Sequence, residues 1–285
     1  MKPLVLKFGG ELLEDAHRLA GVVSAVKSLI HGGSPLVIVH GGGKEIDTAL
    51  AGAGIEKQQV DGLRITDDRT LDVVVCTVAG LVNTRFVATL NAAGIRAVGL
   101  TGADVSCGLS TVAPRHRAAD GRLVDLGRVG VPVAHTETDL LETLVNGRFV
   151  PVIACIGMDQ DGKLLNINAD TLAGHLAARL DATRLVIAGA TPGVLDSDGR
   201  TMPTLEASDI TDLVAGGTAT AGMIAKLRAC EHALAHHVRD VVIVDGRNPS
   251  ALEAAARGQA DARMTRLVLM ALLDESKKSE ETART

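Results

Sequence analysis

Apolar and polar residues follow two alternating patterns along this 285-residue chain. Short continuous apolar runs predict buried strands, and between them apolar residues recur at the three- and four-residue spacing of a helix. We expect strands at residues 4–6, 36–39, 97–100, 150–155, 184–187 and 241–244. We expect helices at residues 12–30, 44–53, 71–90, 169–180 and 251–256. The alternation predicts an α/β fold whose mostly parallel central sheet is covered by helices on both faces.

One segment departs from this alternation. Between residues 110 and 133, short apolar pieces are interrupted by Pro114, Gly121 and Gly127. Gly121 belongs to an Asp-Gly pair, which is typical of hairpin turns. We therefore expect a small antiparallel insertion, with the Arg-His-Arg sequence at residues 115–117 exposed at its tip.

The organisation along the chain suggests two lobes. The glycine-rich and threonine-rich motifs change character near residue 178, so we expect an N-terminal lobe at residues 1–178 and a C-terminal lobe at residues 179–272. Residues 273–285 are charged and poor in apolar side chains, which predicts a disordered tail.

Composition narrows the classes of protein to which the chain can belong. Hydrophobic residues make up 46% of it, but it has three Phe and no Tyr or Trp, so Ala, Val, Leu and Ile must form the core. The few aromatic residues and the net charge of −5 argue against a nucleic-acid partner. No apolar stretch reaches the length of a membrane span and no signal-peptide pattern is present, so we expect no membrane partner and a cytoplasmic location. The four cysteines are widely spaced without a C-x-x-C pair, which favours reduced structural thiols.

Two glycine runs stand where a predicted strand meets a predicted helix. The first ends at Gly9-Gly10 and the second is Gly41-Gly42-Gly43. Such junctions expose backbone N–H groups at the positive end of a helix dipole, and turns that follow parallel strands open at the same edge of the sheet. The two runs could hold a phosphoryl group from both sides, although glycines also simply form tight turns. Neither run matches a Walker A loop or the dinucleotide-binding fingerprint.

Two lysines lie next to glycine-rich segments. Lys7 ends the first strand just before Gly9, and Lys226 follows the small-residue segment 216–223. Two such cations suit a phosphoryl-transfer site, where the protein neutralises developing charge. Alternatively, each lysine could be a surface residue whose ammonium group reaches solvent.

A polar cluster follows the strand before residue 169. Asn166 and Asn168 point to the same side if the strand continues, and Asp170 opens the next helix. One of these residues can cap the helix, and we expect the others to face a ligand. Asp170 could serve both Lys7 and Lys226 as a shared counter-ion.

Two further motifs allow a functional and a structural interpretation. Arg64 lies in a glycine turn ahead of a helix, where it could bind a carboxylate through two parallel hydrogen bonds or form a surface salt bridge. His232 and His236 have the spacing of metal ligands on a helix. Because no third ligand is evident, we interpret them as solvated surface residues and predict no metal site.

Taken in order, these motifs resemble those of the amino-acid kinase family. The matching pieces are residues 7–10, 39–43, 62–67, 124–127, 165–170 and 222–226, and the resemblance extends over nearly the whole chain. It implies a three-layer αβα sandwich with two lobes, the N-terminal lobe binding an acyl amino acid and the C-terminal lobe binding ATP. Within the family, Gly-Leu-Arg at 62–64 and Asn-x-Asn-Ala-Asp at 166–170 are similar to members that phosphorylate the γ-carboxylate of N-acetyl-L-glutamate in arginine biosynthesis.

The resemblance also implies roles for individual residues. Lys7 and Lys226 would stabilise the transferring phosphoryl group, and Asp170 would organise the two lysines. The backbone N–H groups that donate to this group would be those of Gly9, Gly10, Gly42 and Gly43. The residues that hold N-acetyl-L-glutamate would be Gly42, Gly43, Arg64 and Asn166. The residues that line the nucleotide pocket would be Ala190, Thr191, Pro192, Gly193, Val194, Leu195, Thr218, Ala219 and Thr220.

The implied chemistry needs ATP and Mg²⁺, with the metal held mainly by ATP oxygens. A carboxylate acceptor with a pKa of about 4.3 is ionised at neutral pH, so no general base is required. The apolar surface of residues 71–90 is large for a monomer and predicts a homodimer. Because the chain begins at its first strand, it lacks the extra N-terminal helix of relatives that form arginine-inhibited hexamers, and we expect no arginine feedback.

Two segments depart from the family pattern and leave alternatives open. The nucleotide turn at 187–193 lacks the acidic residue usual in the family, and residues 100–105 lack polar residues found in many relatives. One alternative is the same chemistry on a carrier-protein-bound aminoadipate or glutamate. The basic residues that could dock such a carrier are Arg115, His116, Arg117, Arg122 and Arg128. The other alternative is a catalytically silent sensor of nucleotide or amino acid.

Overall fold

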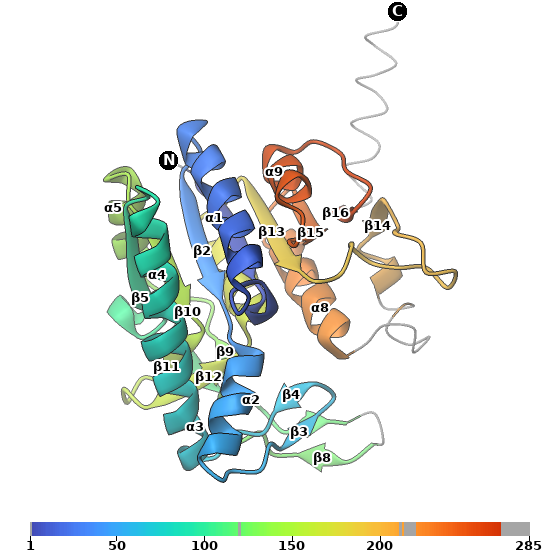
Figure 1. Ribbon diagram of the computed structural model, residues 1–285. Coiled ribbons are helices and arrows are strands. Elements are labelled where there is room, and N and C mark those ends of the chain that lie inside the picture. Colours follow the sequence, from blue (N-terminus) through green and yellow to red (C-terminus); the bar gives the residue numbers. More distant parts are fainter. Residues whose placement is uncertain (1, 119–120, 211–212, 214–220, 269–285) are drawn as a thin grey trace, which may run out of the picture.

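An eight-stranded sheet forms the centre of the molecule (Figure 1). The computed structural model describes residues 2–118, 121–210, 213 and 221–268. In spatial order the strands are β14 (Thr204–Glu206), β16 (Met264–Val268), β15 (Val241–Asp245), β13 (Arg184–Gly189), β1 (Leu4–Phe8), β2 (Leu36–His40), β10 (Val150–Ala154) and β5 (Ala97–Thr101). All neighbours pair in parallel except β15 and β16, which are antiparallel. The predicted mostly parallel α/β fold is confirmed.

Helices cover both faces of this sheet. One face packs against α1 (Ala16–His31), α4 (Asn83–Ala92) and α9 (Pro249–Arg257), as Figure 1 shows for α1 and α4 in front of the strands. The other face packs against α5 (Asp139–Asn146), α6 (Ala169–Arg179) and α8 (Ala221–Ala235). Because successive side chains of a strand point to opposite faces, Leu6 of β1 faces the first layer, while Val5 and Lys7 face the second.

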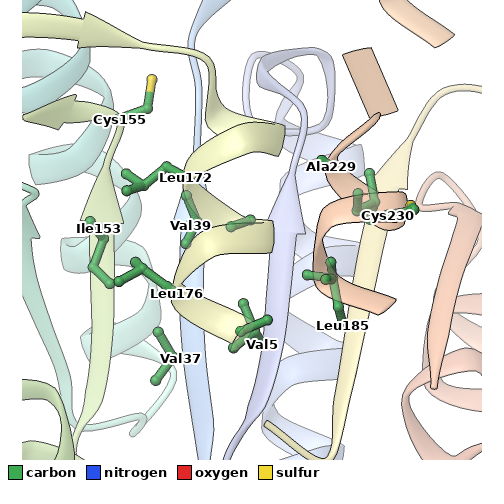
Figure 2. Close-up of a cluster of buried hydrophobic side chains, with 14 of the residues drawn as sticks. Val5, Val37, Val39, Ile153, Cys155, Leu172, Leu176, Leu185, Ala229 and Cys230 are labelled. Carbon is green, nitrogen blue, oxygen red and sulfur yellow. The ribbon is translucent and has the colours of Figure 1, made fainter. Parts of the chain in front are cut away.

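The second face shows how the core positions α6 and α8 (Figure 2). Val5, Val39 and Ile153 come from β1, β2 and β10, and they pack with Leu172 and Leu176 of α6. All five side chains are fully buried. Burying one such side chain stabilises the fold by about 1.5–3 kcal/mol, so this layer fixes α6 firmly against the strands.

A smaller mixed sheet lies beside the carboxyl ends of the central strands. Its order is β11 (Ile156–Met158), β12 (Leu164–Ile167), β9 (Val129–Pro132) and β6 (Ser110–Val112). The antiparallel pairing of β6 with β9, and of β7 (His116–Arg117) with β8 (Leu123–Val124), confirms the predicted insertion. Arg115 and Arg117 are exposed as expected, whereas His116 in β7 is partly buried, with Nε2 2.8 Å from Oδ2 of Asp61. The insertion also joins the protein through parallel pairing of β9 with β12.

The apolar helix expected at 71–90 is longer than predicted and contains a π-helical turn between two α-helical segments. It comprises α3 (Asp68–Val75), a π-helical turn η2 (Cys76–Val82) and α4. The continuous helix has 25 residues with a mean hydropathy of 1.7 in its most apolar part, so the expectation that no stretch reaches membrane-span length was wrong. Its polar residues Thr77 and Asn83 are buried, and Asn83 donates a hydrogen bond to the carbonyl of Val152. We therefore interpret it as a helix that packs on the sheet.

Other elements differ from expectation for local reasons. The helix expected from residue 12 starts instead at Ala16, because the Asp15 side chain accepts a hydrogen bond from the N–H of Arg18 and caps the helix there. Residues 10–12 form a separate 3₁₀ turn, η1 (Gly10–Leu12). After β2, α2 (Gly43–Gly52) begins at the glycine run, and β3 (Gln59–Val60) pairs with β4 (Leu63–Arg64). The elements β14, β16 and α5 were not anticipated. The expected tail at 273–285 lies outside the described residues.

The expected lobe boundary at 178/179 falls in the last turn of α6. Strands on both sides of it belong to one continuous sheet, joined where β1 pairs with β13. The two proposed lobes would thus correspond to the two halves of this sheet.

Candidate active site

Lys7 and Asp170 form a buried ion pair at the carboxyl end of β1. Lys7 faces the α6 layer because of the strand alternation, and its Nζ lies 2.8 Å from Oδ1 of Asp170. Both residues are 5% exposed. Asp170 stands in the first turn of α6, where Asn168 is the cap: its Oδ1 accepts from the N–H groups of Asp170 and Thr171. The sequence predicts that one polar residue of this segment caps the helix, and Asn168 is that residue.

Lys226 approaches Asp170 from a third element. It lies on α8 with Nζ 3.6 Å from Oδ2 of Asp170, and its side chain is 16% exposed. The structure thus brings Lys7, Lys226 and Asp170 together, with one carboxylate between two ammonium groups.

The charges of this cluster support one another. Burial disfavours the charge of Lys7, but the Asp170 carboxylate outweighs burial and raises the pKa of Lys7. Burial acts against the charge of Asp170 as well, and the two lysines overcome it and hold the pKa of Asp170 below its ordinary value. Lys7 and Asp170 therefore both favour their charged forms, and the two lysines can attract an anion.

The two glycine runs meet beside this cluster. A Cβ placed on Gly10 would lie 3.0 Å from both the Cα of Gly42 and the backbone N of Gly43. Gly43 begins α2, so its N–H has no partner within the helix and can serve an anion. The N–H of Gly9 differs from expectation: it donates to the carbonyl of Ala188 at 3.0 Å and is not available to a phosphoryl group in this conformation.

Arg64 lies on β4 next to the second glycine turn. Its Nη2 donates to Oδ1 of Asp47 at 2.5 Å and to the carbonyl of Gly43 at 3.4 Å. Its Nη1 is buried without a hydrogen-bond partner in the described part of the chain. A buried donor without a partner costs about 1–3 kcal/mol, so this atom suits an acceptor brought by a ligand.

Asn166 connects three of the sequence motifs. Its Nδ2 donates to Oγ1 of Thr66 at 3.1 Å, and the N–H of Thr66 donates to the carbonyl of Leu126. Gly127 makes this junction possible, because it has a positive φ of 69° and a Cβ there would lie 2.3 Å from the carbonyl oxygen of Thr66. Arg64 and Asn166 thus belong to one hydrogen-bonded region.

The expected nucleotide turn, residues 190–195, follows β13. The N–H of Val194 donates to Oγ1 of the buried Thr265, and Gly193 has a φ of 87° with no room for a Cβ beside Thr265. Leu195 is exposed. The other expected nucleotide residues, Thr218, Ala219 and Thr220, lie outside the described residues. Thr265 was missed because its strand, β16, was not predicted.

Glu11 is a second residue that sequence reasoning missed. It follows Gly9-Gly10 in η1, and its Oε1 accepts the N–H of Ala190 at 3.2 Å. Its place directly after the first glycine run was a signal that could have found it.

His232 lies on α8 and His236 in the turn directly after it, and both are exposed. The His232 ring stacks on His175, with centroids 6.2 Å apart, and lies 4.2 Å from the His236 ring. Among the described residues, no group of three or more histidine, cysteine or acidic side chains could hold a metal ion.

Known proteins share both the sequence and the fold. The chain is 40% identical over 248 residues to an acetylglutamate kinase from Aromatoleum aromaticum, an alignment that covers 86% of this chain and 82% of that protein. It is 37% identical over 260 residues to an acetylglutamate kinase from Novosphingobium aromaticivorans, with 88% and 86% covered.

Solved structures show the same architecture. The smu.665 protein of Streptococcus mutans UA159 superposes with a TM-score of 0.72 at 26% identity, covering 86% of this chain and 94% of that one. N-acetylglutamate synthase from Neisseria gonorrhoeae, in complex with coenzyme A and N-acetyl-glutamate, gives a TM-score of 0.78 at 25% identity, and the match covers 94% of this chain but 59% of that protein. A carbamate kinase from Giardia shares the fold, with a TM-score of 0.65 at 15% identity and coverage of 94% and 99%. Residues 2–245 match the amino acid kinase family, and the chain therefore belongs to that family.

Proposed function

We propose that this protein transfers the γ-phosphoryl group of ATP to the γ-carboxylate of N-acetyl-L-glutamate, a step of arginine biosynthesis. The observation that carries the proposal is the link between Arg64 and the lysine cluster. The buried, unpartnered Nη1 of Arg64 offers a site for a carboxylate. Arg64 also contacts Gly43, which abuts Gly10 beside Lys7, so a bound acidic substrate would lie next to a cationic phosphoryl site.

The site residues then divide between binding and charge stabilisation. Arg64 holds one carboxylate of the substrate through its guanidinium, and Asn166 stands beside it as a polar contact for the acyl amino acid. Lys7 and Lys226 oppose the repulsion between the carboxylate nucleophile and the phosphates, and Asp170 keeps both ammonium groups in place. In this proposal the backbone N–H groups of Gly10, Gly42 and Gly43 would stabilise the transferring group. No proton needs to move, because the acceptor is already ionised.

ATP supplies the nucleotide and Mg²⁺ neutralises its phosphates. Phosphate oxygens would provide most of the metal ligands, because the described residues contain no cluster that could hold a metal by itself. In this proposal the turn at 190–195 would line the nucleotide pocket, and the other nucleotide residues expected from the sequence, 218–220, lie outside the described residues.

We also propose a cytoplasmic homodimer. β5 is at an edge of the central sheet, and Leu81 on the neighbouring long helix is 55% exposed. An exposed strand edge next to an apolar helix favours burial against a second copy of the chain.

Trapping of the acyl phosphate tests the proposed reaction. Purified protein is incubated with ATP, Mg²⁺, hydroxylamine and a panel of free and N-acylated amino acids. We expect a hydroxamate with N-acetyl-L-glutamate and none with glutamate, because the free ammonium group of glutamate would enter a site in which Arg64 and the two lysines favour anionic groups. Product with a carrier-linked substrate and none with free N-acetyl-L-glutamate would contradict the proposal.

A further inference from the structure

Glu11 is an acid placed within a site that otherwise favours anions. Its carboxylate folds back over the first glycine turn, so that a Cβ on Gly9 would lie 2.3 Å from Oε2. Oε1 accepts the N–H of Ala190, the first residue of the nucleotide turn. A Cβ on Gly189 would lie 3.2 Å from Oε1 of Glu11 and 3.5 Å from Cε of Lys226, so the two side chains flank the same glycine.

The charges around Glu11 set it apart from Asp170. Asp170 is paired with both lysines. Glu11 forms no ion pair with a described residue, although its charge also favours the charged form of Lys7. With Glu11 included, two acidic side chains lie among the two lysines, so Glu11 offsets part of the positive charge that the phosphates would meet.

This balance conflicts with nucleotide binding unless a further cation enters. The phosphates of ATP would meet a carboxylate at the N–H of Ala190, and like charges repel each other in a site of low dielectric. A divalent cation removes the conflict, because Mg²⁺ prefers hard oxygen ligands and is commonly bound by one carboxylate together with substrate phosphates. Glu11 has the donor chemistry that such an ion requires, and no lysine in the described part of the chain forms an ion pair with it.

We propose that Glu11 ligates the divalent cation that accompanies ATP and thereby makes nucleotide binding depend on that cation. This inference rests on the proposed function, because it takes the turn at Ala190 as part of an ATP site. In the empty protein, the Glu11 carboxylate holds the N–H of Ala190; with nucleotide and metal present, its oxygens serve the metal.

Nucleotide binding without turnover tests this role. The affinity for the non-hydrolysable analogue AMP-PNP is measured by calorimetry, once with Mg²⁺ and once with EDTA. In Glu11→Gln the hydrogen bond from Ala190 can persist while the charge is lost. We expect tighter binding in EDTA, weaker binding in Mg²⁺, and a ratio of the two affinities that falls at least about tenfold, or about 1.4 kcal/mol, relative to the parent protein.

Glu14→Gln is the matched control. Glu14 lies three residues further along and pairs with the exposed Lys44, away from Ala190, so this variant should keep the parent ratio. A second readout is the electron paramagnetic resonance spectrum of Mn²⁺ in the complex with AMP-PNP, which should change in Glu11→Gln and not in Glu14→Gln. Thermal melting of both variants verifies that they are folded.

The outcomes are distinguishable. An unchanged affinity ratio in folded Glu11→Gln overturns the inference and leaves the proposed function intact. Equally tighter binding with and without Mg²⁺ also overturns it, because Glu11 would then merely compete with phosphate for the N–H of Ala190. If the parent protein does not bind AMP-PNP in either condition, the proposed function fails, and this inference fails with it.

Discussion

At the scale of single residues, the site depends on buried charges that can be ionised only in combination. Asp170 is almost fully buried, and the cost of removing its charge from water is offset by Lys7 and Lys226. Removal of any one member therefore leaves the others in a medium that disfavours their charge.

Asp170→Asn should damage both stability and activity. The variant leaves the Lys7 ammonium buried without its counter-ion, so we expect a loss of about 3–5 kcal/mol in the free energy of unfolding and a lower pKa of Lys7. Urea unfolding and steady-state kinetics measure the two effects. Asp240→Asn, which alters an ion pair with Arg184 elsewhere, is the control and should retain kcat. Full activity in Asp170→Asn would disprove the role assigned to the cluster.

Arg64→Lys should weaken binding of the acyl amino acid and leave binding of the nucleotide unchanged. A lysine cannot present the two parallel N–H groups of a guanidinium, so we expect KM for N-acetyl-L-glutamate to rise about 10- to 100-fold, or about 1.4–2.7 kcal/mol, with KM for ATP unchanged. Initial rates at varied concentrations of each substrate test this. Arg128→Lys, which alters the ion pair with Asp68, provides a comparison. A selective rise in KM for ATP would contradict the assignment.

His40 should make stability fall in mild acid. Its Nδ1 donates to the carbonyl of Gly41 and its Nε2 accepts from Nδ2 of Asn83, so the ring is held neutral, and burial lowers the pKa of His40 from 6.5 to about 4. Between these values the unfolded chain binds a proton that the folded protein does not. The contribution of the neutral His40 ring to the free energy of unfolding is therefore complete above about pH 6.5. It decreases toward pH 4 by on the order of 3 kcal/mol.

Urea unfolding at several pH values tests this prediction for His40. His40→Gln should show a smaller loss of stability between pH 6.5 and 4 than the parent protein. Some pH dependence should remain, because burial also lowers the pKa of His175 to about 4. An identical slope in the variant and the parent protein would refute the prediction.

At the scale of elements, the contact between the two glycine turns determines how the site is assembled. A Cβ added at Gly10 would contact backbone atoms of Gly42 and Gly43. A Cβ added at Gly42 would instead contact the side-chain methyl groups of Val78 and Val82 on the long helix. A methyl group can shift by a rotamer or a small displacement, but a backbone at the start of α2 cannot move without moving the helix.

Substitution of the two glycines should therefore have unequal effects. Gly10→Ala should lower kcat/KM about 100-fold or more, since displacement of reacting groups by about 1 Å is that costly. Gly42→Ala should cost less, because its φ of −168° suits any residue and its neighbours are side-chain ends. Kinetics and thermal melting of both variants test the order, and equal losses would contradict it.

Elements that the sequence allowed us to predict are those with strong apolar runs. The six predicted strands all exist. Five of them are almost wholly buried parallel strands that read as continuous apolar segments, and the partly buried edge strand β5 also carries an apolar run. β14 and β16 were missed, since their apolar residues alternate with polar ones such as Thr204 on the edge strand β14 and Arg266 on β16 beside it. The π-helical turn at 76–82 carries no periodic signal that separates it from the α-helices on either side.

Part of the candidate site could also be predicted from the sequence, because some of its residues are positioned by local patterns. The pleat of β1 and the helix start at Asn168 put Lys7 and Asp170 on one face, and both positions follow from local patterns. The contacts of Glu11 with Ala190 and of Thr265 with Val194 join residues far apart in the chain. Their geometry is set by the packing of whole elements, which periodicity does not encode.

At the scale of the whole molecule, the exposed apolar helix beside the edge strand β5 should determine assembly. Leu81→Lys places a charge on that surface and should shift a homodimer toward monomer, because a buried lysine without a partner disfavours association. Sedimentation velocity or light scattering over a range of protein concentrations measures the change. Val112→Lys alters an exposed apolar residue on β6 and should not change the mass. A monomeric parent protein would contradict the homodimer.

The central position of β1 has a consequence for synthesis on the ribosome. β1 is translated before both of its neighbours in the sheet, and one of them, β13, follows only after more than half of this chain. Until then one hydrogen-bonding edge of β1 lacks its native partner, and Lys7 lacks both Asp170 and the helix of Lys226. The cluster of Lys7, Asp170 and Lys226 therefore cannot form early in synthesis. The protein can become active only after the two halves of the chain have packed against each other.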